Sequence, residues 1–330
     1  MDVAGLVPGA SEGKGLGNQF LDDLRQADVF IHIVDCSGTT DEEGKPVERH
    51  DPSKDILFLE NELNKWFYGI MMKVWKSFVR KVEQEEGNFA DKVAQQFSGL
   101  KVTENHVKRV LSRLRLPEKP INWTQDHVFW FASELRTESK PTIIAANKVD
   151  LEKAYSNYVF LKMSFPGLII IPCSADSELA LREAAKSELI DYVPGERDFE
   201  IKGNSSKLGQ VKGELSEAQR EALDKIKESV LNKIKEGTGV QEILNHAVFN
   251  LLKYIVVFPV ESANKLTDSK GRILPDCFLL PSGSTALDFA YFLHTDFGNN
   301  FIKAIDARTK KIIGKDHELK NRDALEIITK

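Results

Sequence analysis

The chain has 330 residues, of which 42% are hydrophobic and 29% are charged, and its formal net charge is −5. This length allows two or three domains with cores of their own, and the negative charge argues against a protein that coats nucleic acid through bulk positive charge. Its three cysteines are widely separated and no apolar stretch is long enough to span a bilayer, so we expect reduced thiols in a cytoplasmic protein.

The first fifty residues are predicted to form a loop, a helix and a strand. Residues 2–5 read Asp-Val-Ala-Gly and begin a glycine-rich stretch that favours turns. Residues 18–27 carry apolar side chains at helical spacing. The apolar run at 29–34 ends in Asp35, which is typical of a buried parallel strand. Within that run we expect His32 to be a core histidine rather than a catalytic one.

Residues 53–137 are predicted to form a helical insertion. Apolar side chains recur at steps of three and four from Ile56 to Val82, which predicts a long amphipathic helix or a helical hairpin. Two further helices are expected at about 104–114 and 126–135. The four tryptophans of this region fit the packing faces of helices better than a surface on which bases stack.

A basic cluster also falls in the insertion. Its members are Lys101, Lys108, Arg109, Arg113 and Arg115. We expect a solvated helix face, and a contact with ribosomal RNA is the alternative.

Alternation of strands and helices returns after the insertion. We expect buried strands at 142–146 and 168–171 and a helix from about residue 176 to before Pro194. Residues 203–213 are expected to be a polar linker. Two more helices are predicted at about 216–235 and 240–250, on either side of Gly237-Thr238-Gly239.

The last segment, from about residue 254, is predicted to be a small α+β unit. The predicted strands lie at 255–260, 277–280, 301–306 and 324–329. One helix is expected at 285–294, with Ser284 as its N-cap. We expect His294 to cap the C-terminal end of this helix, and a binding contact is the alternative. Two strands, a helix and further strands within about 75 residues suggest a β-grasp fold.

Asn147-Lys148-Val149-Asp150 directly follows the strand at 142–146, and the carboxyl ends of such strands are where open α/β sheets bind ligands. A carboxylate at Asp150 can accept from both guanine N1–H and the exocyclic amine, a pair of donors that adenine lacks. Asn147 is expected to hold neighbouring loops and reach the base edge, and the Lys148 stem to pack against the ring. The alternative is a polar turn with no ligand.

Two further pairs of residues fit a guanine nucleotide. Ser174-Ala175 follows the next strand, where a small residue lets a backbone N–H approach guanine O6. Asp2 would hold Mg²⁺ through water and the Gly5 N–H would meet the γ-phosphate. Leu6 stands where a water-orienting glutamine is found in Ras-like enzymes, so we assign no catalytic residue.

Two segments resemble a known family. Residues 2–28, DVAGLVPGASEGKGLGNQFLDDLRQAD, resemble the switch II segment of Obg/YchF-type P-loop GTPases, in which an apolar residue also follows the Asp-x-x-Gly. Residues 280–296, LPSGSTALDFAYFLHTD, with LKNRD at 319–323 and EII at 326–328, resemble a TGS domain. The order of these segments matches YchF-like proteins with a helical insertion.

The resemblance implies a cytoplasmic, translation-linked protein that binds GTP and GDP with Mg²⁺. It also implies contacts with the ribosome or RNA through the TGS domain and the insertion, with no membrane association and no DNA specificity. Many YchF proteins have an altered base motif and favour ATP, whereas Lys148 and Asp150 are intact here, so we predict guanine. Arg322 replaces the glycine that usually precedes the aspartate of the last TGS turn.

We therefore predict an α/β fold with an incomplete P-loop GTPase-type parallel sheet and a C-terminal TGS β-grasp domain. The predicted boundaries are 1–194 for the partial GTPase domain with its insertion at 53–137, 195–253 for a helical linker region and 254–330 for the TGS domain. No Gly-x-x-x-x-Gly-Lys-Ser/Thr phosphate loop occurs in the sequence. We expect an N-terminally truncated GTPase whose strand at 29–34 exposes an unpaired apolar edge.

Three functions remain open. The first is a GTPase of the Obg/YchF group, with hydrolysis itself left undecided. The second is a non-catalytic module that binds the ribosome, RNA or protein and keeps a degenerate nucleotide site. The third and most distant is a ubiquitin-like protein adaptor built on the TGS-like segment.

Overall fold

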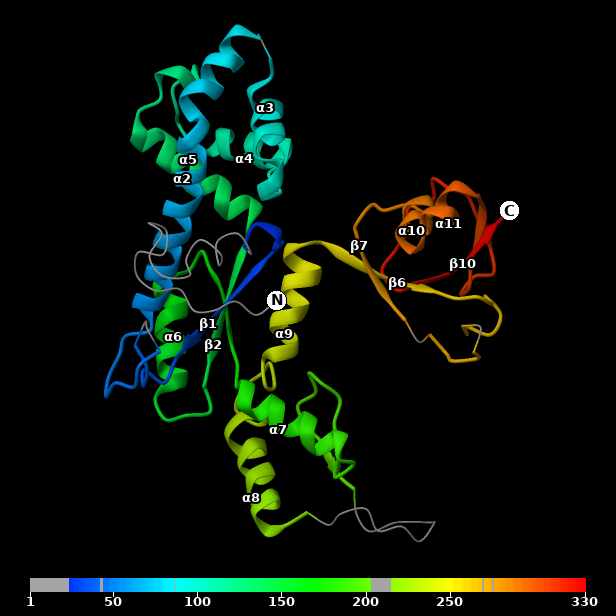
Figure 1. Ribbon diagram of the computed structural model, residues 1–330. Helices are drawn as coiled ribbons and strands as arrows, with labels where there is room; N and C mark the ends of the chain where they lie inside the picture. The colour runs from blue at the N-terminus through cyan, green and yellow to red at the C-terminus, as the bar shows by residue number, and fades with distance from the viewer. Residues whose placement is uncertain (1–23, 42–43, 86, 203–214, 269, 275) are drawn as a thin grey trace. The chain divides into compact units, whose positions relative to one another are not determined.

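The computed structural model describes residues 24–41, 44–85, 87–202, 215–268, 270–274 and 276–330 (Figure 1). The chain divides into two compact units, residues 1–244 and 245–330, and each is considered by itself. None of the helices in the described residues is both long enough and apolar enough to cross a membrane.

The first unit is built on a three-stranded parallel sheet of β1 (Phe30–Asp35), β2 (Thr142–Asn147) and β3 (Ile169–Pro172), in that order. One face of the sheet is apolar because alternate side chains of neighbouring strands point to the same side, and it forms part of a core with the helices that follow β2 and β3. Among the described strands β1 lies at the sheet edge with Ile31 and Ile33 exposed, as the sequence predicted.

Helices and short strands follow β2 in the first unit. They are α6 (Ala154–Ser164), α7 (Ala175–Lys186), β4 (Ile190–Asp191), β5 (Glu200–Ile201), α8 (Glu217–Ile226), the π-helix η4 (Lys227–Leu231) and α9 (Val240–Asn245). The helix predicted at 216–235 is shorter as an α-helix than expected, since its regular part ends at Ile226.

The insertion between β1 and β2 is helical, as predicted. It contains α2 (Ser53–Gln84), α3 (Phe89–Gln96), η2 (Ser98–Leu100), α4 (Glu104–Arg113), η3 (Pro120–Asn122) and α5 (Gln125–Ser139). The segment whose apolar side chains recur at helical spacing from Ile56 forms one continuous helix of 32 residues, α2, rather than a hairpin. Thr103 and Thr124 begin α4 and α5 with capping boxes that satisfy the first free amides.

Aromatic side chains fill the core of the insertion. Trp75 stacks on Trp123 with ring centroids 5.5 Å apart, and Phe131 lies edge-on to Trp123 at 5.0 Å. Trp66 is buried as well. The expectation that the tryptophans pack inside is therefore confirmed for three of them and wrong for Trp130, whose side chain is 53% exposed.

The basic cluster of the insertion is largely neutralised by carboxylates. Lys101 bonds Asp28, and Lys108 bonds Glu104. Arg109 and Arg113 share Glu138. Because four of the five cations have carboxylate partners, the cluster fits the predicted solvated face better than a phosphate-binding surface.

The second unit has a five-stranded mixed sheet in the order β7-β6-β10-β8-β9, with β6 and β10 parallel and the other neighbours antiparallel. Its elements are the π-helix η5 (His246–Leu251), β6 (Tyr254–Pro259), β7 (Phe278–Pro281), α10 (Ala286–Leu293), α11 (Thr295–Asn299), β8 (Phe301–Asp306), β9 (Ile312–Ile313) and β10 (Asp323–Thr329). Phe289 of α10 is fully buried in the core with strand residues, which gives the expected β-grasp arrangement.

Two local predictions in this unit are wrong. Thr285, not Ser284, is the N-cap of α10, since its hydroxyl accepts from the Asp288 amide while the Asp288 carboxylate accepts from the Thr285 amide. The His294 side chain does not cap the C-terminal end of α10. Its Nδ1 instead accepts from the Asp296 amide at 3.1 Å and caps the start of α11.

Candidate functional site

Two of the predicted motifs meet at one edge of the three-stranded sheet. Asp35 and Asn147 are register partners at the ends of β1 and β2, and Ala146 is the partner of Pro172 near the end of β3. The loops that begin at Asn147 and at Cys173 are therefore neighbours at the carboxyl edge. Asp2 and Gly5 lie outside the described residues.

Asn147 joins the two loops, which agrees with the expectation that it holds neighbouring loops. Its Oδ1 accepts from the Ala175 amide at 3.0 Å and from the Cys173 thiol at 3.7 Å. A backbone bond of 3.2 Å from Val149 N to Cys173 O adds a second link. The Asn147 side chain therefore sets the distance between the β2 loop and the first residue of α7.

Lys148 adopts a left-handed backbone conformation, with φ of 65°, and its Nζ donates to Asp35 Oδ2 at 2.9 Å. Burial raises the pKa of Asp35, but hydrogen bonds from Ser37, Lys148 and Thr40 outweigh it and lower that pKa to about 2. The sequence analysis had not singled out Asp35 as a site residue. The sequence signal for Asp35 was its position at the end of a predicted strand, because a neighbouring parallel strand ends at the base motif.

Asp150 is half-buried, and in the described part of the chain its carboxylate has no hydrogen-bond or ion-pair partner. The carboxylate lies close enough to the end of β3 to affect Cys173. Burial and the charge of Asp150 together raise the pKa of that thiol to about 12, so Cys173 stays protonated. Asp150 therefore presents an acceptor that no residue in the described part of the chain uses.

Helix α7 starts directly at this edge. Ser174 is its N-cap, with the hydroxyl accepting from the Ser177 amide, and the Ala175 amide is occupied by Asn147. Asp176 is exposed, and its amide has no acceptor among the residues that the structure describes. The first turn of a helix concentrates partial positive charge, so this N–H suits a partly negative oxygen.

A turn far along the chain supports the same edge. Thr238 is fully buried, and its carbonyl oxygen accepts from the Ser174 amide at 2.9 Å. Gly239 has φ of 78°, and a Cβ there would lie 1.9 Å from Pro172 O, so the turn fits directly against the end of β3. The sequence analysis treated residues 237–239 only as a break between helices, although two glycines around a threonine are a turn signal.

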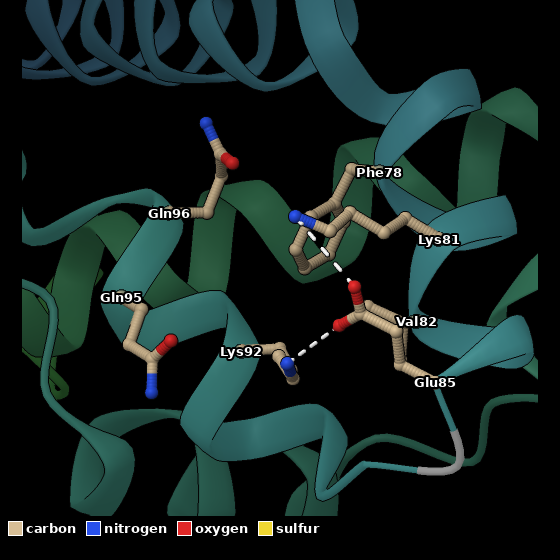
Figure 2. Close-up of a pocket in the computed structure, with 7 residues that line it drawn as sticks. All are labelled: Phe78, Lys81, Val82, Glu85, Lys92, Gln95 and Gln96. Carbon is tan, nitrogen blue, oxygen red and sulfur yellow. Dashed lines mark hydrogen bonds and ion pairs between the residues drawn. The ribbon is translucent and has the colours of Figure 1, made fainter.

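The pocket in Figure 2 belongs to the insertion and contains none of the predicted site residues. It has a volume of about 200 Å³ and lies between α2 and α3. Glu85 bonds both Lys81 and Lys92 there, so the charges in the pocket are mostly matched within the protein. The described residues that the sequence predicted for the site lie at the strand ends and not in this pocket.

Comparisons with known proteins show which family the chain belongs to. A family model described as "Obg-like GTPase YGR210-like, G4 motif-containing domain" matches residues 145–262, and a TGS domain model matches residues 266–329. The chain is 47% identical over 329 residues to a GTP-binding protein of Methanocaldococcus jannaschii, an alignment that covers 100% of this chain and 80% of the relative. The chain belongs to the Obg/YchF family of GTPases.

Solved structures in this family are similar in fold. A GTP-binding protein of Pyrococcus horikoshii is 39% identical, with a TM-score of 0.68 over 94% of this chain and 81% of that one. The YchF GTPase of Schizosaccharomyces pombe is 20% identical and has a TM-score of 0.53 over 98% and 78%, which shows the fold alone. The ribosome-binding ATPase YchF of Buchnera aphidicola is 28% identical over 308 residues, covering 92% of this chain and 68% of that protein.

Proposed function

We propose that this GTP-binding protein recognises the guanine base at the carboxyl edge of its parallel sheet. Asp150 accepts from N1–H and the exocyclic amine, and the first turn of α7 donates a backbone N–H to O6. The observation that carries the proposal is that, among the described residues, neither the Asp150 carboxylate near the end of β3 nor the Asp176 amide that follows β3 has a hydrogen-bond partner. One acceptor and one donor at the same edge match the pattern of guanine, and adenine presents the opposite pattern at its N6 and N1.

The remaining residues of the motifs have supporting roles in this proposal. Asn147 sets the spacing of the two loops, and the small side chains of Ser174 and Ala175 leave room for the base. The Lys148 stem packs along the ring while its ammonium is held by Asp35.

Mg²⁺ is proposed to arrive with the phosphates of GTP and to be held through water by Asp2, with Gly5 at the γ-phosphate. Among the described residues no cluster of His, Cys, Asp or Glu could hold a metal ion. Asp35 in particular is surrounded by protein donors. We derive no step of hydrolysis from the ion, and GTP hydrolysis stays a prediction.

The proposed partner is the ribosome or its RNA, in the cytoplasm. Two comparisons support it: the TGS match at 266–329 and the relative named a ribosome-binding ATPase. The paired charges of the insertion favour the second unit, residues 245–330, as the contact, because its twelve Lys and Arg residues exceed its ten Asp and Glu residues within a chain of net charge −5. The alternative is a non-catalytic binding module with a degenerate nucleotide site.

A binding experiment tests the proposal. Calorimetric titration of the 330-residue chain with GDP and with ADP, in Mg²⁺, is expected to show tighter binding of GDP. Asp150→Ala should reduce that preference roughly ten- to hundredfold, since a hydrogen bond to a charged group contributes about 1.5–3 kcal/mol. Asp224→Ala, which removes an exposed carboxylate on α8, is the matched control and should leave the preference unchanged.

Three results would contradict the base assignment or favour the alternative. Equal affinities for GDP and ADP in the unmodified chain would contradict the proposal that the site recognises guanine. An unchanged preference for GDP over ADP in Asp150→Ala would contradict the proposed role of Asp150. Ribosome co-sedimentation that ignores nucleotide and survives Asp150→Ala would favour the binding module.

A further inference from the structure

We infer that Thr238 is a specificity-determining residue for guanine O6, because it positions the first turn of α7. This inference rests on the proposed function and adds a residue to it from a segment that no base motif contains. Thr238 does not touch the base in this account. It acts through Ser174 and the amides that follow.

Thr238 holds the first turn of α7 at both ends. Its carbonyl oxygen accepts from the Ser174 amide at 2.9 Å, immediately before the helix. Its hydroxyl donates to Glu178 Oε2 at 2.5 Å, one turn later. The exposed amide of Asp176 lies between these two attachments in the sequence, so its position depends on both of them.

Glu178 is a firm anchor for the Thr238 hydroxyl. Its side chain is buried, the Tyr192 hydroxyl donates to the same oxygen at 2.8 Å, and Arg182 bonds the other oxygen. Burial raises the pKa of Glu178, but the hydrogen bonds from Thr238, Arg182 and Tyr192 outweigh it and leave that pKa lowered. The carboxylate therefore stays ionised with two other partners when the Thr238 hydroxyl is removed.

The turn that carries Thr238 is itself fixed to the sheet. Gly239 fits against Pro172 O, and the Gly239 amide donates to Glu236 O at 3.0 Å. Because this turn packs against the end of β3, the Thr238 carbonyl oxygen holds the Ser174 amide at a fixed position relative to β3.

The Asp150 side of the site has separate support. Leu151 N donates to Lys148 O at 3.0 Å within the loop after β2, and Val149 N donates to Cys173 O directly after β3, so neither of these bonds involves Thr238. Loss of the Thr238 hydroxyl should therefore shift the O6 donor and leave the acceptor for N1–H and the amine in place. This separation makes the inference testable with base analogues.

The experiment compares three nucleotides on the full chain by calorimetric titration. 6-Thio-GDP replaces only O6, and IDP lacks only the exocyclic amine. In the unmodified chain both analogues should bind more weakly than GDP. Thr238→Val, which keeps the side-chain shape, should reduce the ratio of GDP to 6-thio-GDP affinity roughly three- to tenfold and leave the ratio of GDP to IDP unchanged.

Two further variants control the result. Thr238→Ser keeps the hydroxyl and should restore the ratio of GDP to 6-thio-GDP affinity. Asp150→Ala should show the opposite pattern, losing the preference for GDP over IDP and keeping the preference over 6-thio-GDP. Thermal melting of each variant checks that it is folded.

The outcomes separate this inference from the proposed function. If Thr238→Val leaves both ratios unchanged or reduces them equally, Thr238 has only a general structural role and the inference is overturned. If the unmodified chain shows no preference for GDP over ADP, the proposed function fails and the inference fails with it.

Discussion

The ammonium of Lys148 lies 2.9 Å from Asp35 Oδ2 and links the carboxyl ends of β2 and β1. The Asp35 side chain is 11% exposed, and Ser37, Thr39 and Thr40 donate to it in addition to the lysine. The base-motif lysine is therefore held by an ion pair to the end of the neighbouring strand.

Replacement of Asp35 by Asn is expected to lower stability and to change its pH dependence. The folded pKa of about 2 lies below the ordinary 3.8, so the stabilisation is present above about pH 4 and is lost as pH falls through about 2. Asp35→Asn should reduce the free energy of unfolding by about 2 kcal/mol at pH 7. Urea denaturation from pH 7 to pH 2 measures this.

The pH series provides the check on this explanation. The difference between the two proteins should begin to narrow below about pH 4 and should be small near pH 2. A difference that stays constant across the series would mean that packing, not the charge of Asp35, explains the loss. Asp224→Asn on the surface of α8 is the control and should change little.

Lys140, at the end of α5, is the second charged group whose removal we expect to matter. It is fully buried, and its Nζ donates to Arg25 O and to Ala27 O, each at 2.6 Å. Lys140→Met leaves both carbonyls without this donor and should cost about 2–4 kcal/mol of stability at pH 7. Lys54→Met, at an exposed position of α2, is the matched control with little expected effect.

The pH dependence of Lys140 has the opposite sign to that of Asp35. Burial, with a smaller effect from Lys101, lowers the pKa of Lys140 from 10.5 to about 8, so the unfolded chain binds more protons between these values. The unmodified protein should therefore gain stability relative to Lys140→Met as pH rises from about 8 to 10.5. Urea denaturation of both proteins at pH 7.5 and 9.5 tests the sign, and a constant difference would contradict it.

Local patterns predicted much of this fold, and long-range contacts account for what they missed. Local signals of burial are the apolar runs that form β1, β2 and β3 and the apolar residues that recur every three or four positions along the 32-residue helix α2. Asp35 and Thr238 were missed because their partners lie 113 and 60 residues away in the chain. The spacing of apolar residues along the chain does not predict a hydrogen bond between side chains of two different loops.

The cap of α10 failed for a different reason. Ser284 and Thr285 are both good N-cap residues, and propensity alone does not choose between them. The spacing does, because Asp288 stands three residues after Thr285 and returns a bond to its amide. A search for the reciprocal partner as well as for the cap residue would have predicted the helix start correctly.

Gly239 is expected to be intolerant of a side chain. Gly239→Ala combines a φ of 78° with a Cβ 1.9 Å from Pro172 O and 2.9 Å from the Cys173 Cα, so the backbone must move. We expect a loss of at least about 2 kcal/mol in thermal or urea unfolding. Gly237→Ala is the matched control, since its φ of 63° is similar but its nearest contact is 3.2 Å from Glu196 O. Equal losses in the two variants would show that φ, not the contact with β3, limits this turn.

Arg322→Gly is expected to stabilise the second unit. Arg322 has a left-handed φ of 70° in the turn before β10, a conformation that glycine adopts without strain. The turn is held by backbone and amide bonds that the change keeps: Arg322 N donates to Val256 O at 2.7 Å, and Val256 N donates to Asn321 Oδ1 at 2.9 Å. The guanidinium has no protein partner among the described residues, so its removal loses no bond there.

The expected gain for Arg322→Gly is roughly 0.5–1 kcal/mol, measured as a higher unfolding midpoint, because relief of left-handed strain exceeds the added entropy of glycine in the unfolded chain. Lys320→Gly tests the same change at a neighbouring residue that does not have positive φ, and it should be destabilising by a similar amount. If both variants lower the midpoint, the left-handed conformation at residue 322 is not a source of strain, and the arginine stabilises the turn through its side chain instead.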